Sequence, residues 1–218
     1  MDSSIFPPAT SGNEDGVIGF SSIINCDMLL DAYYHGIFPW PFEERSILWS
    51  SPKMRAIISM DNVHIPKSLS RELKQDKFEI RVDTCFADVI DACASVKRPD
   101  EDGTWITRKM RKAYKDFHLQ GYAHSFEAFN KEGKLAGGLY GVLIGRIFCG
   151  ESMFFHESGA SKIAFCHAID ILRQHNVEII DTQMVTNLTK SFGAHEIPIA
   201  EYLSLLKKLR DDKPTPLR

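Results

Sequence analysis

A strand, a helix and a second strand are encoded in one continuous segment, residues 150–183, which reads GESMFFHESGASKIAFCHAIDILRQHNVEIIDTQ. Both ends of the segment are rich in apolar residues, and a helical pattern fills positions 160–175. A helix between two strands at this spacing indicates a strand–helix–strand unit, whose strands lie parallel and are joined by a right-handed crossover. We therefore expect the two strands to be adjacent, or nearly so, in one sheet.

The patterns outside this segment predict antiparallel hairpins before it. Gly133 and Gly145 mark turns between predicted strands, and Thr107 and Gly121 bound a predicted helix. Strands are predicted over residues 54–60, 78–82, 124–129, 135–143, 146–155 and 177–183, and helices over residues 26–34, 67–74, 86–95, 108–119, 160–175 and 200–209. This order predicts an α/β (α+β) fold with a mixed, largely antiparallel sheet.

The start of the chain has a different character. Residues 1–16 are rich in Pro, Ser, Gly and acidic residues, which predicts a flexible or peripheral arm. Pro39, Pro41 and Pro52 predict that residues 36–52 form no regular secondary structure. Because this proline-containing stretch is also strongly aromatic, we expect it either to be buried or to form the wall of a binding site.

Composition places the chain among soluble globular proteins. It has 218 residues, of which 44% are hydrophobic and 25% are charged. The five cysteines are scattered and never spaced as CxxC, which excludes a disulfide framework or a zinc ribbon and suits a reducing compartment. Since no apolar run is long enough to cross a bilayer and no signal peptide is recognisable, we expect a cytoplasmic protein without membrane contacts, metal or cofactor.

The net charge of −3 does not exclude nucleic acid as a partner, because the charge is unevenly distributed. Residues 1–44 contain seven acidic groups and no Lys or Arg, so the rest of the chain is basic overall. The predicted helix 108–119 opens with a dense group of cations, which includes Arg108, Arg111, Lys112 and Lys115. These cations indicate contacts with nucleic-acid phosphates, although such a run also suits an ordinary solvated helix face.

Three polar side chains are predicted to meet beside the strand–helix–strand unit. Asp181 and Gln183 are two residues apart on the second strand and therefore share a face, and Glu151 lies on the first strand. Sheets of this kind open a ligand crevice at the ends of such strands. Spacing alone favours a structural interpretation, in which Asp181 caps a turn and Gln183 is a strand-end polar group.

Aromatic residues form a further group of candidates. Trp40 and Trp105 are flanked by Pro or Thr in predicted loops, where their rings could stack on the bases of a single-stranded nucleic acid. The alternative is that the aromatic residues of the first part of the chain form a hydrophobic core. For Phe38 and Phe42 we favour the core.

Nine short segments, in consistent order over about residues 25–206, together resemble one family. They are AYYHGIFPWP (32–41), ILWSSP (47–52), GTWITR (103–108), GYAHSFE (121–127), GGLYGV (137–142), FCGESMF (148–154), ASK (160–162), IIDTQ (179–183) and GAHEIP (193–198). The family is the leucyl/phenylalanyl-tRNA–protein transferases. The resemblance implies a small N-terminal domain at residues 1–53 and a GNAT-like acyltransferase domain at residues 54–218.

The activity implied by this resemblance is aminoacyl transfer. The donor is tRNA charged with Leu or Phe, with Met as a further possibility, and the acceptor is the α-amine of a protein that begins with Arg or Lys. The product is thereby marked for N-degron proteolysis. By the same resemblance, Trp40 and Trp105 stack on the terminal adenosine of the tRNA with Tyr33 nearby, and Leu139 and Phe148 line the pocket for the aminoacyl side chain.

Glu151, Asp181 and Gln183 match the polar catalytic group of the family, and the basic helix matches a surface for the tRNA acceptor stem. An aminoacyl ester is already activated, so the enzyme mainly positions two reactants and assists one proton transfer. Our hypothesis is that Asp181 orients Gln183 against the attacking amine and that Glu151 binds an ammonium group.

Two other functions remain open. One is a non-catalytic relative that binds aminoacyl-tRNA or the N-terminal degron. The other is a GNAT acyltransferase with a different donor, against which the lack of a glycine-rich pyrophosphate loop before residue 160 argues. The chain departs from the family's usual residues at Ser50, Lys53, Leu139, Thr182 and Leu188, so the preference among Leu, Phe and Met is left open.

Overall fold

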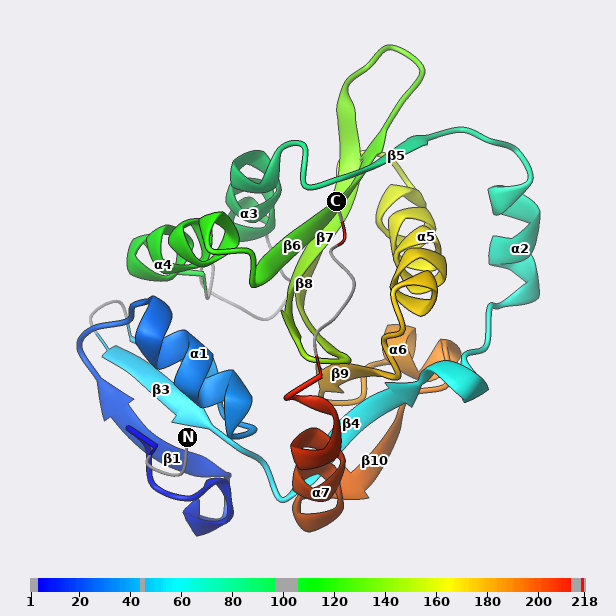
Figure 1. The fold of residues 1–218 in the computed structure, drawn as a ribbon. Helices are drawn as coiled ribbons and strands as arrows, with labels where there is room; N and C mark the ends of the chain where they lie inside the picture. Colours follow the sequence, from blue (N-terminus) through cyan, green and yellow to red (C-terminus); the bar gives the residue numbers. More distant parts are fainter. Residues whose placement is uncertain (1–3, 44–45, 97–105, 213–216, 218) are drawn as a thin grey trace.

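The computed structural model describes residues 4–43, 46–96, 106–212 and 217. Within these residues the strands form a smaller sheet of order β1–β3–β2 and a larger sheet of order β10–β4–β9–β8–β7–β6–β5 (Figure 1). None of the described helices combines the length and the apolar character that a bilayer span requires. The fold is mixed α/β, as the sequence predicted.

The larger sheet is mixed and mostly antiparallel. Its described strands are β4 (Met54–Ser59), β5 (Glu79–Val82), β6 (Ala123–Phe129), β7 (Leu135–Ile144), β8 (Ile147–Phe155), β9 (Ile179–Gln183) and β10 (His195–Pro198). Among the neighbouring strands described, β8 and β9 pair in parallel, and all the other pairs are antiparallel. Helix α5 (Ala160–Gln174) connects β8 to β9, so the predicted strand–helix–strand unit is confirmed.

Helices cover both faces of this sheet (Figure 1). On one face α5 packs over Leu139 and Leu143 of β7, and α2 (Lys67–Leu73) packs against α5. On the other face α3 (Phe86–Ser95) and α4 (Arg108–Leu119) pack over Tyr140 and Val142. The side chains of a strand alternate between its faces, so β7 contributes to both cores. Helix α4 has Thr107 as its N-cap and buries the apolar face that the sequence predicted.

The smaller sheet corrects one prediction. Residues 36–52 were predicted to lack regular structure, but they contain β2 (Phe38–Glu43) and β3 (Ser46–Ser50), which pair with each other and with β1 (Val17–Ser21). Pro39 and Pro41 are accommodated because β2 is the edge strand, where an imino nitrogen that points outward leaves no ladder hydrogen bond unmade. The prolines therefore mark a sheet edge rather than a loop.

The two sheets share one continuous apolar core. Helix α1 (Cys26–Tyr34), capped by Asn25 as predicted, packs against α4, and its residue Leu29 joins the same cluster as Phe117 and Tyr140. The described part of the N-terminal arm lies against the smaller sheet, where the ring of Phe6 is 4.6 Å from that of Trp49. The predicted domain boundary after residue 53 falls between β3 and β4, and the division into two domains stays a prediction.

Short elements escaped the sequence analysis. They are β1, β10 and helix α6 (Asn187–Ser191), each of five residues or fewer. Helix α7 (Ile199–Leu209) was predicted, and it ends against the β7–β8 turn at Gly145. The docking of α7 on this turn leaves no room for a side chain at position 145.

We predict that Gly145→Ala strongly destabilises the fold. Gly145 has a φ of +55°, and a Cβ there would lie 2.0 Å from the main-chain oxygen of Leu209. Backbone strain and overpacking together should lower the free energy of unfolding by about 2–4 kcal/mol, measured by urea denaturation. The control is Gly121→Ala, which has a φ of +83° but open space around the Cβ. It should cost only about 1 kcal/mol, and equal losses at the two positions would contradict the packing argument.

Candidate active site

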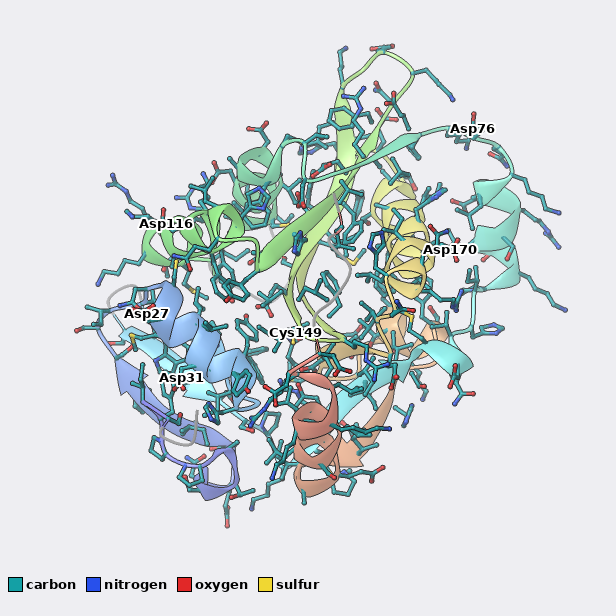
Figure 2. All side chains as sticks on the ribbon, viewed as in Figure 1. Asp27, Asp31, Asp76, Asp116, Cys149 and Asp170 are labelled. Atoms are coloured by element: carbon teal, nitrogen blue, oxygen red, sulfur yellow. The ribbon has the colours of Figure 1, made fainter. Side chains whose placement is uncertain are left out.

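The candidate site opens where β8 and β9 separate. The two strands pair over three positions that end at Cys149 opposite Asp181, after which β8 continues to Phe155 while β9 ends at Gln183. Figure 2 labels Cys149 near the centre of the molecule, at this last paired position. A cavity of about 420 Å³ occupies the gap beyond it. The crevice expected beside the strand–helix–strand unit is therefore present.

Two β-bulges lie at the mouth of this gap. Glu151 in β8 and Thr182 in β9 are each an extra residue opposite a regular neighbouring strand. Bulges redirect side chains and commonly occur beside functional sites. Gln183 follows the second bulge with a φ of +57°, a conformation that costs a non-glycine residue about 1–3 kcal/mol. Its amide Nε2 donates a hydrogen bond of 3.0 Å to Oε1 of Glu151, and both side chains line the cavity.

Asp181 lies behind the cavity rather than on its surface. Its carboxylate is fully buried and accepts hydrogen bonds from Nε and Nη2 of Arg55 at 2.9 and 2.7 Å and from Oη of Tyr202 at 2.7 Å. It also accepts the main-chain N–H of Gln183 at 2.9 Å. Sγ of Cys149 is a fifth donor, 3.7 Å from Oδ2. Surrounded in this way, the carboxylate holds the strained backbone of Gln183 in place and does not face the space where a substrate would bind.

Arg55 is a site residue that the sequence analysis missed. Its guanidinium, only 1% exposed, also donates to the main-chain oxygen of Gly36 at 3.3 Å and lies 4.5 Å from the ring centre of Phe38. Burial opposes its charge, but the neighbouring Asp181 carboxylate overcomes this and raises the pKa of Arg55 above its usual value. A lone charge within the apolar strand MRAIIS signals a buried ion pair, although the sequence does not identify its partner.

Glu151 has a very different environment. Burial raises the pKa of the Glu151 carboxyl to about 7, with a smaller contribution in the same direction from the Asp181 charge, while hydrogen bonds from Tyr33 and Tyr114 oppose the rise. Tyr114 donates to Oε2 of Glu151 at 3.0 Å, and the Tyr33 and Tyr114 hydroxyls are 2.5 Å apart. Near neutral pH this carboxyl is therefore divided between its charged and neutral forms, which suits a group that accepts and returns a proton.

The cavity has an apolar end and an aromatic rim. The apolar end is lined by Leu139, Met153, Phe165, Ile180 and Leu188. Trp40 is on the rim, 36% exposed, with its ring at 76° to that of Phe38. Glu151 is the single carboxylate among the described lining residues, and none of those residues is basic. Such a space accepts an apolar side chain next to a cationic or neutral amine.

The other predicted binding residues have different positions. Tyr33 is buried under Glu151 rather than on the cavity wall. Phe148 is also fully buried, with its ring packed edge-on against Phe126, and it is not among the residues that line the cavity. Trp105 lies outside the described residues. The roles proposed for these three residues stay predictions.

The predicted phosphate-binding cations are on the outer part of α4, where most of them already contact acids. Arg111 and Lys115 both pair with Asp91, at 3.2 and 2.8 Å, and Lys112 pairs with Asp116 at 2.6 Å. Arg108 begins the same helix. Exposed ion pairs of this kind contribute little to stability, so a phosphate could replace the acid at low cost.

Comparison with known proteins settles the family. The family model described as "Leucyl/phenylalanyl-tRNA protein transferase" matches residues 57–207, and the model of its N-terminal domain matches residues 24–53. The chain belongs to this family. The resemblance noted in the sequence is thereby confirmed.

Curated members of the leucyl/phenylalanyl-tRNA–protein transferase family match nearly the whole chain. The one from Desulfatibacillum aliphaticivorans is 45% identical over 201 residues, which cover 92% of this chain and 86% of the relative. The one from Saccharophagus degradans is 43% identical over 212 residues, or 96% of this chain and 86% of the relative. Among solved structures, L-PGS from Bacillus licheniformis aligns with a TM-score of 0.44 and 12% identity over 63% of this chain and 48% of that one, too remote a likeness to support an argument.

We predict that Arg55→Met severely destabilises the protein. Loss of the guanidinium leaves the buried Asp181 carboxylate without its counter-ion, and breaking such a pair costs about 3–5 kcal/mol. Urea denaturation measures the loss. The matched control is Arg81→Met, which removes an exposed pair with Glu79 and should leave the unfolding midpoint nearly unchanged. If both variants unfold at the wild-type midpoint, the Arg55–Asp181 pair does not support the fold.

Proposed function

We propose that this protein transfers Leu or Phe from aminoacyl-tRNA to the N-terminal α-amine of proteins that begin with Arg or Lys. Its membership of the leucyl/phenylalanyl-tRNA–protein transferase family supports an aminoacyltransferase that acts on proteins. The observation that supports the chemistry is the cavity, which combines an apolar end, an aromatic rim and the hydrogen-bonded pair of Glu151 and Gln183.

The donor fits this cavity in two parts. Its Leu or Phe side chain occupies the apolar end, where the desolvation cost excludes charged amino acids. The terminal adenosine of the tRNA stacks on Trp40 at the rim, and the cations of α4 contact phosphates further along the acceptor stem. The ester joins these two parts, so it lies beside Glu151 and Gln183.

The reaction needs one proton acceptor. The α-ammonium group of the acceptor, with a pKa near ~8, binds at Glu151, loses a proton to it and becomes the nucleophile. The amine nitrogen then attacks the ester carbonyl carbon, the bond to the ribose oxygen breaks, and the proton held by Glu151 returns to that oxygen. The second proton that the nitrogen loses as the amide forms passes to water. Gln183 orients Glu151 and the reactants, because a neutral amide is too weak a base for this role. Asp181 acts by positioning Gln183.

The acceptor preference follows from the charges in the cavity. Among the described lining residues Glu151 is the one carboxylate, and its charge attracts an acceptor with a side-chain cation beside its α-ammonium group more strongly than one with the α-ammonium group alone. The product carries a new N-terminal Leu or Phe, which marks it for N-degron proteolysis. We place this reaction in the cytoplasm, where aminoacyl-tRNA is made and used.

A carboxylate at the start of α5 disfavours the alternative of a coenzyme A donor. Oε2 of Glu72 lies 2.8 Å from the position that a Cβ of Gly159 would occupy, and Gly159 is the N-cap of α5. Helix N-termini attract anions, and here the negative group is already supplied by the protein. A donor pyrophosphate would therefore meet a like charge.

Transfer is tested with tRNA charged with labelled Leu, Phe or Met and with peptides that begin with Arg, Lys or Ala. Label should move to the Arg and Lys peptides only, because their side-chain cations add to the attraction between the α-ammonium group and Glu151. Comparison of the three donors measures the preference of the apolar end. Binding of charged tRNA without transfer would instead indicate a non-catalytic relative. Equal transfer to the Ala peptide would contradict the acceptor preference but not the transfer activity.

We predict that Glu151→Gln lowers the transfer rate about 100-fold and makes the fold more stable above neutral pH. The native pKa near 7 is above the ordinary value of 4.5, so the native state holds this proton more tightly and loses stability as pH rises from about 4.5 to about 7. The variant has no such loss and should gain about 3 kcal/mol over the wild type at pH 8. The gain should be small at pH 4, and a gain independent of pH would contradict the raised pKa.

A further inference from the structure

Neither packing nor backbone conformation explains why residue 150 is a glycine. It follows Cys149, the last residue of β8 that pairs with β9, and it lines the cavity. Apart from its two chain neighbours, a Cβ at position 150 would approach no described residue more closely than the main-chain oxygen of Asp181, at 3.9 Å. Its φ is outside the left-handed region that favours glycine. A glycine inside a strand weakens that strand, so its presence here suggests a need for open space.

The cross-strand partner of Gly150 is also a glycine, but packing explains that one. Gly141 of β7 pairs with Gly150, and a Cβ at position 141 would lie 2.4 Å from both the main-chain oxygen of Cys149 and Cζ of Phe148. Gly141 is therefore required by the packing of the sheet. One glycine of the pair faces a filled core, and the other faces the cavity.

The open space at Gly150 lies beside the reacting groups. Glu151 is the next residue, and its carboxyl is bonded to the amide of Gln183 across the gap between the strands. A side chain at position 150 would enter this gap from β8, toward the main chain of Asp181 on β9. The donor ester connects the apolar end of the cavity to its aromatic rim, so it passes through the same region.

We propose that Gly150 is a positioning residue for the transfer reaction: its lack of a side chain leaves the space in which the donor ester meets the acceptor amine. This inference rests on the proposed function. A methyl group at position 150 displaces the ester carbonyl from the amine held at Glu151. Displacement by about 1 Å is enough to lower a reaction rate about 100-fold.

The variant Gly150→Ala tests this inference against two matched controls. Gly19→Ala places a methyl group in open space on β1, and Gly141→Ala places one in the packed sheet. We expect Gly150→Ala to unfold at the same urea concentration as Gly19→Ala, whereas Gly141→Ala unfolds much earlier. In single-turnover assays with charged tRNA and an Arg peptide, Gly150→Ala should transfer about 100-fold more slowly than wild type.

Competition by uncharged tRNA separates positioning from a structural effect. Uncharged tRNA carries no aminoacyl ester, so it should bind Gly150→Ala and wild type equally well. Gly150→Ser should lose as much transfer as Gly150→Ala, because added volume rather than polarity causes the loss.

Three results would overturn the inference while the wild type remains active. They are wild-type transfer by Gly150→Ala, a loss of stability equal to that of Gly141→Ala, and a parallel loss of affinity for uncharged tRNA. If the wild type transfers no label, the proposed function fails and this inference fails with it.

Discussion

The ion pair between Arg55 and Asp181 connects the elements that build the reaction centre. Arg55 comes from β4 and Asp181 from β9, Tyr202 of α7 donates to the same carboxylate, and the main-chain oxygen of Gly36 ties the end of α1 to the guanidinium. All these groups are buried, so each needs the others to offset the cost of leaving water. The strained backbone of Gln183 is held by the same carboxylate.

This arrangement separates the tasks of two acids that lie close together. Asp181 faces the Arg55 cation and two further N–H or O–H donors, from Gln183 and Tyr202, which fix its position behind the cavity. Glu151 faces the cavity, and its protein hydrogen-bond donors are uncharged groups of Tyr33, Tyr114 and Gln183, so burial raises its pKa to about 7. One carboxylate gives the site its geometry, and the other is suited to exchange a proton with a substrate.

Much of the fold could be predicted because its signals are local. Thr107 and Gly121 bound α4 as expected, and the segment from β8 through α5 to β9 folds as a parallel unit. The prolines of β2 misled the analysis because proline removes a hydrogen-bond donor but does not reveal whether the strand is at an edge. Glu151 and Gln183 were predicted as site residues and line the cavity, whereas Arg55, Tyr114 and Tyr202 were not predicted because each contacts a partner distant in sequence.

By itself, the sequence determined most helices and strands of the larger sheet, its mixed character and the family, since these depend on patterns within short segments. The tertiary structure alone decided that β8 and β9 separate after Cys149, that bulges at Glu151 and Thr182 turn the polar pair into the gap, and that Asp181 is closed off from it. These features arise from contacts such as that between Arg55 and Asp181, which are 126 positions apart. No local pattern encodes a contact of that range, because it forms only when the whole core packs.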